Sequence, residues 1–454
     1  MNMKPNILFL VIDSLRADKC YGHEKTSITP NIDSLIDNGV YFTQAISSAA
    51  ATAVAVSSML TGLYPFNSGM GDTTYHKLDS NILNYIKVLK DNGYHTYSSA
   101  PEIATDFGLT YDFENVDSSY DNYFSLFAGL GDQILEKFSS NNLHEPWFFY
   151  IHLFDLHTPV IVPNEFSDEK FGISQYEKMV SAIDLWIGQL LKKINLEQTL
   201  ILLTSDHGEY VPVIKHGDEI INLEPSSTES NLWKIGNKVP KNLYPMKRKF
   251  GSMLRSARGK LKSSKISTLS LSPYENRVLL DSRMGSGHRV FDDLIRVPLL
   301  FSGYGISNQQ IISQQVKHVD IFPTILDLFS FENPNKVDGI SLVTLLKGEQ
   351  MEEAPACIES PPSIEGDSEK IIGIRTSDYK FLKNISNQEQ PVELYDLKND
   401  PLEEYNVANE KPEIISNLNS MLQKIRINTK IDQKEHDEDE IKKIEEKLKK
   451  LGYT

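Results

Sequence analysis

The segment that decides the fold is Pro5-Asn6-Ile7-Leu8-Phe9-Leu10-Val11-Ile12-Asp13, near the start of the 454-residue chain. Its six consecutive apolar residues lie between a Pro-Asn pair and an aspartate, which predicts a β-strand that is buried on both faces. Strands of this kind belong to parallel sheets that are covered by helices on both sides. The rest of the chain must therefore supply neighbouring strands and covering helices.

Strand and helix patterns alternate through about the first 345 residues. Apolar runs predict further strands at 95–98, 147–154, 199–204 and 296–301. Helical spacing of apolar residues predicts helices from Pro30, over 82–91, over 176–191 and over 316–328. This alternation predicts an α/β layered fold with a mostly parallel central sheet.

The pattern changes after about residue 350. Short strands are predicted at 371–375, 379–384 and 392–395, followed by a helix over 410–425. We therefore expect an α/β domain over residues 1–350 and a small α+β subdomain over residues 351–425. Residues 426–454 are rich in charge, and their apolar positions fall on one face of a predicted tail helix that is exposed to solvent.

Composition limits the class of protein. A hydrophobic content of 40% and a charged content of 24% are those of an ordinary globular chain. The net charge of −16 argues against a protein that binds nucleic acid. No apolar run reaches the about 20 residues that span a bilayer, and the first run is too short for a secretory signal. Two cysteines cannot form a disulfide framework, so we expect a cytoplasmic protein.

One segment departs from the acidic balance of the chain. Residues 234–265 contain eleven Lys or Arg and no Asp or Glu. They belong to a long insertion, residues 210–287, which is either a solvated surface loop or a functional lid. As a lid, the insertion would attract an anionic glycan, a lipid head group or a nucleotide-linked donor. The basic segment is also a candidate for peripheral contact with an anionic surface.

Candidate metal ligands follow two of the predicted strands. Asp13 ends the first strand, and Asp206 and His207 follow the strand 199–204. The carboxyl ends of parallel strands form one edge of the sheet, where α/β proteins bind ligands. Two carboxylates and an imidazole can hold one divalent cation. The alternative for Asp13 is a helix cap.

Several motifs, in one order, resemble those of the sulfatase-like branch of the alkaline phosphatase superfamily. They are Pro5-Asn6-Ile7-Leu8-Phe9 leading to Asp13, Thr29-Pro30-Asn31-Ile32-Asp33, Leu60-Thr61-Gly62-Leu63-Tyr64-Pro65, Ser205-Asp206-His207-Gly208-Glu209, and the segments 295–299, 318–324, 379–380, 393–397 and 400–401. The resemblance covers roughly residues 4 to 410. It implies an alkaline-phosphatase-like fold and a metal-dependent enzyme acting on phosphate or sulfate esters.

The position of the nucleophile departs from the sulfatase pattern. Sulfatases carry a Cys or Ser in a C/S-x-P-x-R motif, ten residues before the Gly of the Leu-Thr-Gly turn, and convert it to formylglycine. Counting back from Gly62 leads to Thr52, and Val54 and Val56 stand in place of the Pro and Arg. Thr52 looks like the threonine nucleophile of phosphodiesterase and phosphotransferase members, so we expect no formylglycine. The alternative is that Thr52 only caps the following helix.

The resemblance implies one divalent cation, held by Asp13, Thr52, Asp206 and His207. Ser14 stands where many sulfatases have a second adjacent aspartate, so one carboxylate is lost from the ligand set. A mixed oxygen and nitrogen set is compatible with Zn, Mn, Mg or Ca, and the sequence does not choose among them.

Two further histidines match family positions near the substrate. His157, in a segment that also contains His152 and Asp155, is similar to the histidine that touches the substrate anion or the leaving oxygen. His288 stands where relatives place a Lys or His before a strand. Imidazole can donate a proton near neutral pH, so each is a candidate acid, with a structural role as the alternative. We expect Asp155, His157 and His288 to contact the substrate and His152 to be structural.

These residues predict a metal-dependent hydrolase or transferase, with phosphoester or phosphodiester chemistry favoured. Thr52 would attack phosphorus or sulfur in line, and His157 or His288 would protonate the leaving oxygen. A sulfuric ester hydrolase is the alternative within the enzymes. A catalytically silent relative that binds an anionic ligand is the alternative from another class.

Overall fold

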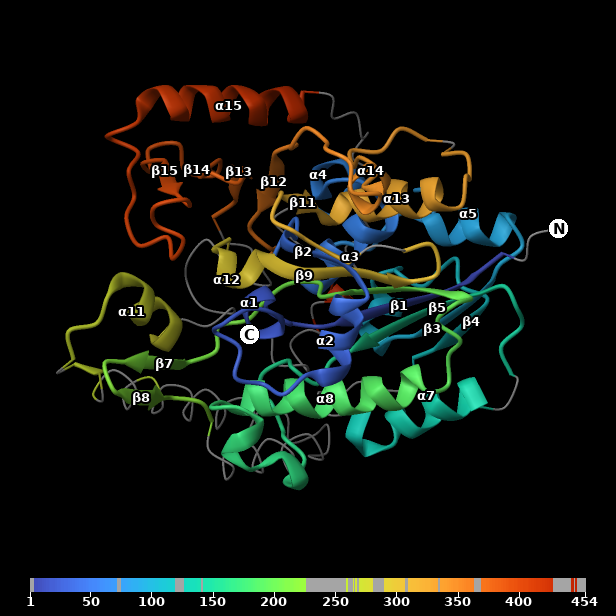
Figure 1. Ribbon diagram of the computed structural model, residues 1–454. Helices are drawn as coiled ribbons and strands as arrows, with labels where there is room; N and C mark the ends of the chain where they lie inside the picture. The colour runs from blue at the N-terminus through green and yellow to red at the C-terminus, as the bar shows by residue number, and fades with distance from the viewer. Residues whose placement is uncertain are drawn as a thin grey trace.

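One large β-sheet forms the centre of the molecule (Figure 1). The computed structural model describes residues 4–71, 75–118, 126–139, 142–225, 259, 264, 266–267, 269–280, 290–306, 309–333, 335–362, 369–427, 442–444 and 446. Within these residues the sheet has the strand order β10-β2-β9-β6-β1-β5-β3-β4, and β11 pairs with β2. Its strands are β1 (Asn6–Ile12), β2 (Gly39–Ile46), β3 (His95–Ser99), β4 (Asn115–Asp117), β5 (Trp147–Leu153), β6 (Thr199–Thr204), β9 (Arg296–Gly303), β10 (Gln310–Ile312) and β11 (Val316–Lys317).

The predicted α/β fold with a mostly parallel sheet is confirmed. β1 is paired in parallel with β5 on one side and with β6 on the other. β9 is the exception, because it runs antiparallel to both β2 and β6. The carboxyl ends of β1, β5 and β6 therefore lie side by side at one edge of the sheet.

Successive side chains of β1 enter two different cores, as the alternation of a strand requires. Odd-numbered residues from Ile7 to Val11 pack in one cluster with α3 (Thr52–Thr61), α5 (Tyr85–Asp91) and α13 (Ile321–Leu328). Even-numbered residues from Leu8 to Ile12 pack in the other with α2 (Pro30–Asp37), α7 (Leu130–Ser139) and α8 (Gln175–Leu191). Figure 1 shows these two helical layers on opposite faces of the sheet. Shorter helices are α1 (Ala17–Cys20), α4 (Pro65–Ser68), α6 (Glu102–Asp106), α12 (Asp292–Ile295) and α14 (Val343–Leu346).

The C-terminal region forms a second, antiparallel sheet. Its strands are β12 (Ala356–Glu359), β13 (Ile371–Arg375), β14 (Tyr379–Asn384) and β15 (Glu393–Asp396), and α15 (Pro412–Arg426) packs against them. The backbone N–H of Glu359 donates to the carbonyl of Ser48, at 2.9 Å. The small sheet therefore supports the chain that leads to α3.

The described parts of the insertion form a small unit of their own. β7 (Val213–His216) and β8 (Glu219–Asn222) make a hairpin that packs with α11 (Pro273–Leu280) around a separate hydrophobic cluster. Nearly all of the basic segment 234–265 lies outside the described residues. Its predicted role as a lid or a surface contact stays a prediction.

Three details differ from the sequence-based expectations. The predicted helix over 316–328 begins only at Ile321, because β11 and a 3₁₀ turn occupy its first five residues. Apolar periodicity alone does not separate such a short buried strand from a helix. The sequence also did not predict several strands, among them β2, β4, β7, β8, β10 and β12. In the tail, Ile444 is 3% exposed and packs in the main core, although the sequence predicts a solvated tail helix.

Among the described residues, no helix has the length and apolarity needed to cross a membrane.

Candidate active site

The predicted metal ligands meet at the edge of the sheet where β1 and β6 end. Asp13 directly follows β1, and Asp206 and His207 follow β6 after one residue. Because the two strands are parallel and in register, their ends place these side chains together. One ligand atom from each lies within 4.8 Å of the others, and all three residues are fully buried.

Ser14 links the two carboxylates. Its backbone N–H donates to Oδ1 of Asp206 at 3.1 Å, and its hydroxyl donates to Oδ1 of Asp13 at 2.6 Å. Ser14 has a left-handed backbone with φ of 65°, which costs a residue other than glycine about 1–3 kcal/mol. The turn after β1 is therefore strained at Ser14, and in this conformation Ser14 bonds the carboxylates of both Asp13 and Asp206.

Thr52 places its hydroxyl at the same point. It is the first residue of α3, and its Oγ1 lies 3.1 Å from Oδ2 of Asp13 and 3.4 Å from Nε2 of His207. Ala51, and not Thr52, is the N-cap residue, and no side chain caps the helix. The capping alternative therefore does not fit the structure. Backbone N–H groups at this helix start can bind an anion beside the hydroxyl.

His152, for which the sequence predicts a structural role, also belongs here. Nε2 of His152, at the end of β5, lies 3.6 Å from Oδ2 of Asp13. Its Nδ1 is 2.9 Å from the hydroxyl of Tyr150. The position of His152 at the carboxyl end of a strand, as for Asp13, is the signal that could have identified it.

The charge of Asp13 is set by competing effects. Burial alone would raise the pKa of its carboxyl group. The neighbouring imidazoles of His152, His207 and His157 outweigh burial and hold this pKa well below its ordinary value. Asp13 is therefore an anionic carboxylate, the form that binds a cation.

The three residues predicted to contact the substrate have different positions. His157 is buried, its Nδ1 lies 3.0 Å from the carbonyl of Thr158, and its ring stacks on Phe154. Asp155 is fully buried and accepts a hydrogen bond from the backbone N–H of Leu126, and burial raises its pKa to about 8. His288 lies outside the described residues. Substrate contact by these residues stays a prediction.

The donor set fits one divalent cation. Oδ2 of Asp206 is buried and has no hydrogen-bond partner among the described residues. A buried carboxylate oxygen in that state is costly unless a cation or a donor satisfies it. Asp13, Asp206 and His207 could hold the ion, and the hydroxyl of Thr52 lies within reach of the same point. These oxygen and nitrogen donors do not select one metal.

Comparison with known proteins identifies the family. The family model described as Sulfatase matches residues 5–331. The chain belongs to the sulfatase family. A second model, described as the C-terminal region of N-sulphoglucosamine sulphohydrolase, matches residues 281–428. Members of the sulfatase family bind a divalent metal ion, in agreement with the donor set of this chain.

Individual relatives are distant but similar over most of their length. Arylsulfatase K of Gallus gallus is 22% identical over 93% of this sulfatase-family chain and 82% of its own. The crystal structure of phosphonate monoester hydrolase of Agrobacterium radiobacter has a TM-score of 0.65, with 18% identity, 94% coverage of this chain and 96% of its own. Another structure, in complex with its substrate D-glucosamine-2-N,6-O-disulfate, has a TM-score of 0.63, with 17% identity and coverage of 95% and 100%. The predicted family and the alkaline-phosphatase-like fold are confirmed.

Proposed function

We propose that this sulfatase-family protein is a metal-dependent ester hydrolase in which Thr52 is the nucleophile. The observation that carries the proposal is the position of the Thr52 hydroxyl, 3.1 Å from Asp13 and 3.4 Å from His207. A side chain that served only to cap α3 would direct its oxygen to the backbone instead. Family membership supports the coarser conclusion that the protein is an ester hydrolase.

The chemistry follows from the groups around Thr52. A divalent cation held by Asp13, Asp206 and His207 would favour the deprotonated hydroxyl and neutralise the anionic oxygens of the substrate. The Thr52 oxygen forms a bond to phosphorus or sulfur while the bond to the leaving oxygen breaks. Backbone N–H groups at the start of α3 stabilise the charge on the remaining oxygens. His157, near Asp13, is the proposed donor of a proton to the leaving oxygen.

Phosphate esters are the favoured substrates. Val54 and Val56 replace the Pro and Arg of the sulfatase modification motif, so formylglycine is not expected to form. A phosphothreonine intermediate can be released by attack of water, or of an acceptor hydroxyl, on phosphorus. A sulfuric ester hydrolase is the second candidate, because the family and the named arylsulfatase relative favour it.

We infer that the ester group belongs to an anionic glycan or a related sugar. The structural relative in complex with D-glucosamine-2-N,6-O-disulfate supports this class. The size of the insertion and the basic residues of 234–265 suit a substrate with more than one negative charge. A lipid head group and a nucleotide-linked donor are the alternative anionic substrates.

A paired substrate panel tests the function. The full chain is stripped of metal and loaded separately with Zn²⁺, Mn²⁺, Mg²⁺ or Ca²⁺. Each form is assayed with p-nitrophenyl phosphate, bis-p-nitrophenyl phosphate, p-nitrophenyl sulfate and D-glucosamine-2-N,6-O-disulfate, with Thr52→Ala as the control. Metal-dependent turnover of a phosphoester that is lost in Thr52→Ala supports the proposal. Turnover confined to sulfates selects the second candidate, and no turnover with any metal favours a silent relative.

A further inference from the structure

We propose that Asp293 couples the inserted helix α11 to the loops that carry the metal ligands, and that it is a positioning residue for the cation site. The inference rests on the cation site of the proposed function. It concerns Arg16, Asp293 and Arg277, whose contacts given below are with the ligand loops and with each other and not with the ligand atoms. Three sets of contacts carry it.

The first set joins Arg16 to both ligand loops. Arg16 lies three residues after Asp13, on the turn that ends β1, and is buried. Its Nη1 donates to the carbonyl of Glu209 at 3.3 Å, two residues after His207. Its Nε and Nη2 also bind the carboxylate of Asp18, at 2.8 and 2.9 Å. One rigid, planar guanidinium therefore holds the chain after Asp13 against the chain after His207.

The second set places Asp293 against the same two loops. Oδ1 of Asp293 lies 2.7 Å from Nη2 of Arg16, with both side chains nearly fully buried. The backbone of α12 also meets the ligand loop, because the N–H of Gly208 donates to the carbonyl of Leu294 at 2.8 Å. A Cβ at Gly208 would lie 2.0 Å from the carbonyl oxygen of Asp293, so only glycine permits this approach. A shift of Asp293 would therefore displace the loop of Asp206 and His207 in two ways, through Arg16 and through the backbone contact with Gly208.

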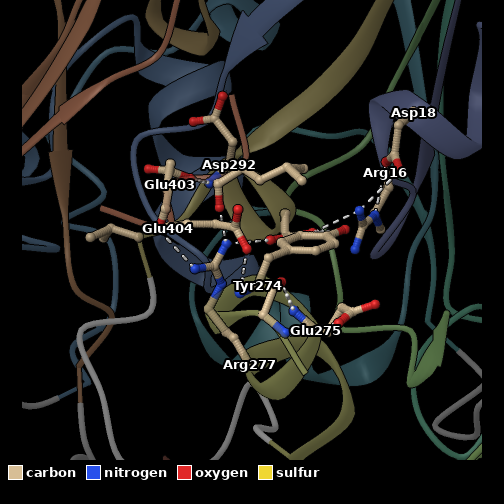
Figure 2. Close-up of polar contacts among 12 residues, drawn as sticks. Arg16, Asp18, Tyr274, Glu275, Arg277, Asp292, Glu403 and Glu404 are labelled. Atoms are coloured by element: carbon tan, nitrogen blue, oxygen red, sulfur yellow. Dashed lines mark hydrogen bonds and ion pairs between the residues drawn. The ribbon is translucent and has the colours of Figure 1, made fainter. Parts of the chain in front are cut away.

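The third set attaches the insertion to Asp293. Arg277 of α11 lies 3.5 Å from Oδ2 of Asp293, and Tyr274 donates its hydroxyl to Oδ1 at 3.4 Å. Arg277 also donates to the carbonyls of Leu402 and Glu403, at 2.6 and 3.1 Å. Figure 2 shows Tyr274 between Arg277 and Arg16, with Glu403 and Glu404 beside the inserted helix.

The packing around Arg277 favours an arginine at this position, where α11 contacts Asp293. The Arg277 guanidinium lies 3.8 Å from the centre of the Phe291 ring and 5.3 Å from that of Tyr274. The backbone N–H of Tyr274 donates to the Glu404 carboxylate at 3.2 Å. Helix α11 is therefore fixed to the C-terminal region and to Asp293 at once, and its docking is linked to the geometry of the ligand loops.

When two events are coupled, such as cation binding and docking of α11, each changes the free energy of the other by the same amount. If docking of α11 through Asp293 favours the arrangement of Asp206 and His207 that binds a cation, then the cation must favour docking of α11 equally. Residues that orient metal ligands without touching the metal typically change its affinity by about 10- to 100-fold. Because Asp293 acts through Arg16 and the backbone, we expect an effect near the lower end, about tenfold.

The first experiment measures Mn²⁺ affinity by calorimetry on the metal-stripped full chain. Asp293→Asn should weaken binding about tenfold, and Arg277→Met should weaken it less but in the same direction. Asp184→Asn is the matched control, because Asp184 is a buried carboxylate that binds the N–H groups of Asn31 and Ile32 at the start of α2. This control should lose stability but keep its Mn²⁺ affinity.

The second experiment measures amide hydrogen exchange in peptides that cover α11. Addition of Mn²⁺ should slow exchange in residues 273–280 of the unaltered protein and leave it unchanged in Asp293→Asn. Equal Mn²⁺ affinity in Asp293→Asn and the unaltered chain would overturn the coupling and leave the cation site intact. Failure of the unaltered chain to bind Mn²⁺ would instead overturn the cation site and the coupling together. Arg277→Met, which leaves the contact between Asp293 and Arg16 in place, provides the same test if Asp293→Asn does not fold.

Discussion

The hydroxyl of Thr52 lies 3.1 Å from the Asp13 carboxylate, although 39 residues separate them in the chain. One group starts a helix and the other ends the central strand of the sheet. Their meeting point also receives His207 and, from β5, His152. A hydroxyl, an anionic carboxylate and two imidazoles are thus brought together by parallel strand ends and one helix start.

The strained turn at Ser14 gives a prediction about stability. Ser14→Ala loses the 2.6 Å hydrogen bond to Asp13 but keeps the left-handed backbone, so the free energy of unfolding should fall by about 1.5–3 kcal/mol. Ser14→Gly loses the same bond but relieves the strain, so it should be more stable than Ser14→Ala. Urea unfolding of the three proteins measures the difference. A glycine variant less stable than the alanine variant would show that the turn is not strained.

Removal of the metal should destabilise the protein. Asp13 and Asp206 are fully buried carboxylates whose ligand atoms lie close together. A cation at a concentration 100 times its Kd contributes about 2.7 kcal/mol to the stability of the folded state. EDTA should therefore lower Tm, and re-addition of the cation should restore it. Asp206→Asn is the control and should respond little; an EDTA effect of equal size in this variant would place the ion elsewhere.

His157→Ala should lower kcat by about 10² to 10⁴ if His157 is the general acid. The loss should be small for a p-nitrophenyl ester, because this leaving group needs little protonation, and large for an alkyl ester. His144→Ala is the matched control, since His144 is exposed and lies outside the site. An equal loss with both esters would return His157 to a structural role.

Asp155 gives a prediction about pH. Burial raises the pKa of its carboxyl group from 3.8 to about 8. At a pH between these two pKa values, Asp155 is ionised in the unfolded chain and protonated in the folded chain. The free energy that protonated Asp155 contributes to folding is therefore lost as pH rises from about 4 to about 8. Asp155→Asn removes this dependence. The Tm of the variant relative to the unaltered protein should therefore be higher at pH 8 than at pH 5, and a relative Tm that falls over this range would contradict the assignment.

The sequence predicts the elements of the fold well where the local apolar pattern matches the burial that the sheet and its helices impose. The strands β1 and β6 and the helix α8 were predicted nearly to the residue, because their apolar runs or stripes are long and clearly bounded. The candidate ligands Asp13, Asp206 and His207 could be proposed from the sequence because they come directly after such strands or one residue later. The position of Thr52 came from the resemblance, by counting back from Gly62.

Other features depend on contacts that no local pattern records. The sequence predicts a structural role for His152, because this residue lies on the face of its strand opposite to Phe149 and Leu153, and only pairing with β1 brings it to Asp13. β12 was missed because its four residues lie in a polar, proline-rich stretch and gain their order from pairing with β13. The link from Arg277 through Asp293 to Arg16 joins three distant segments, which sequence spacing does not reveal.

The mass of the peptide that contains residue 52 shows whether Thr52 is the nucleophile. The metal-loaded protein is quenched during turnover of the best phosphoester and digested, with Thr52→Ala and Thr52→Ser treated in parallel. We expect a phosphoryl or phosphodiester adduct on Thr52. Thr52→Ser should keep some activity and form the same adduct, because a hydroxyl remains, and Thr52→Ala should show neither activity nor adduct. Unmodified Thr52, together with robust turnover by Thr52→Ala, would show that Thr52 is not the nucleophile.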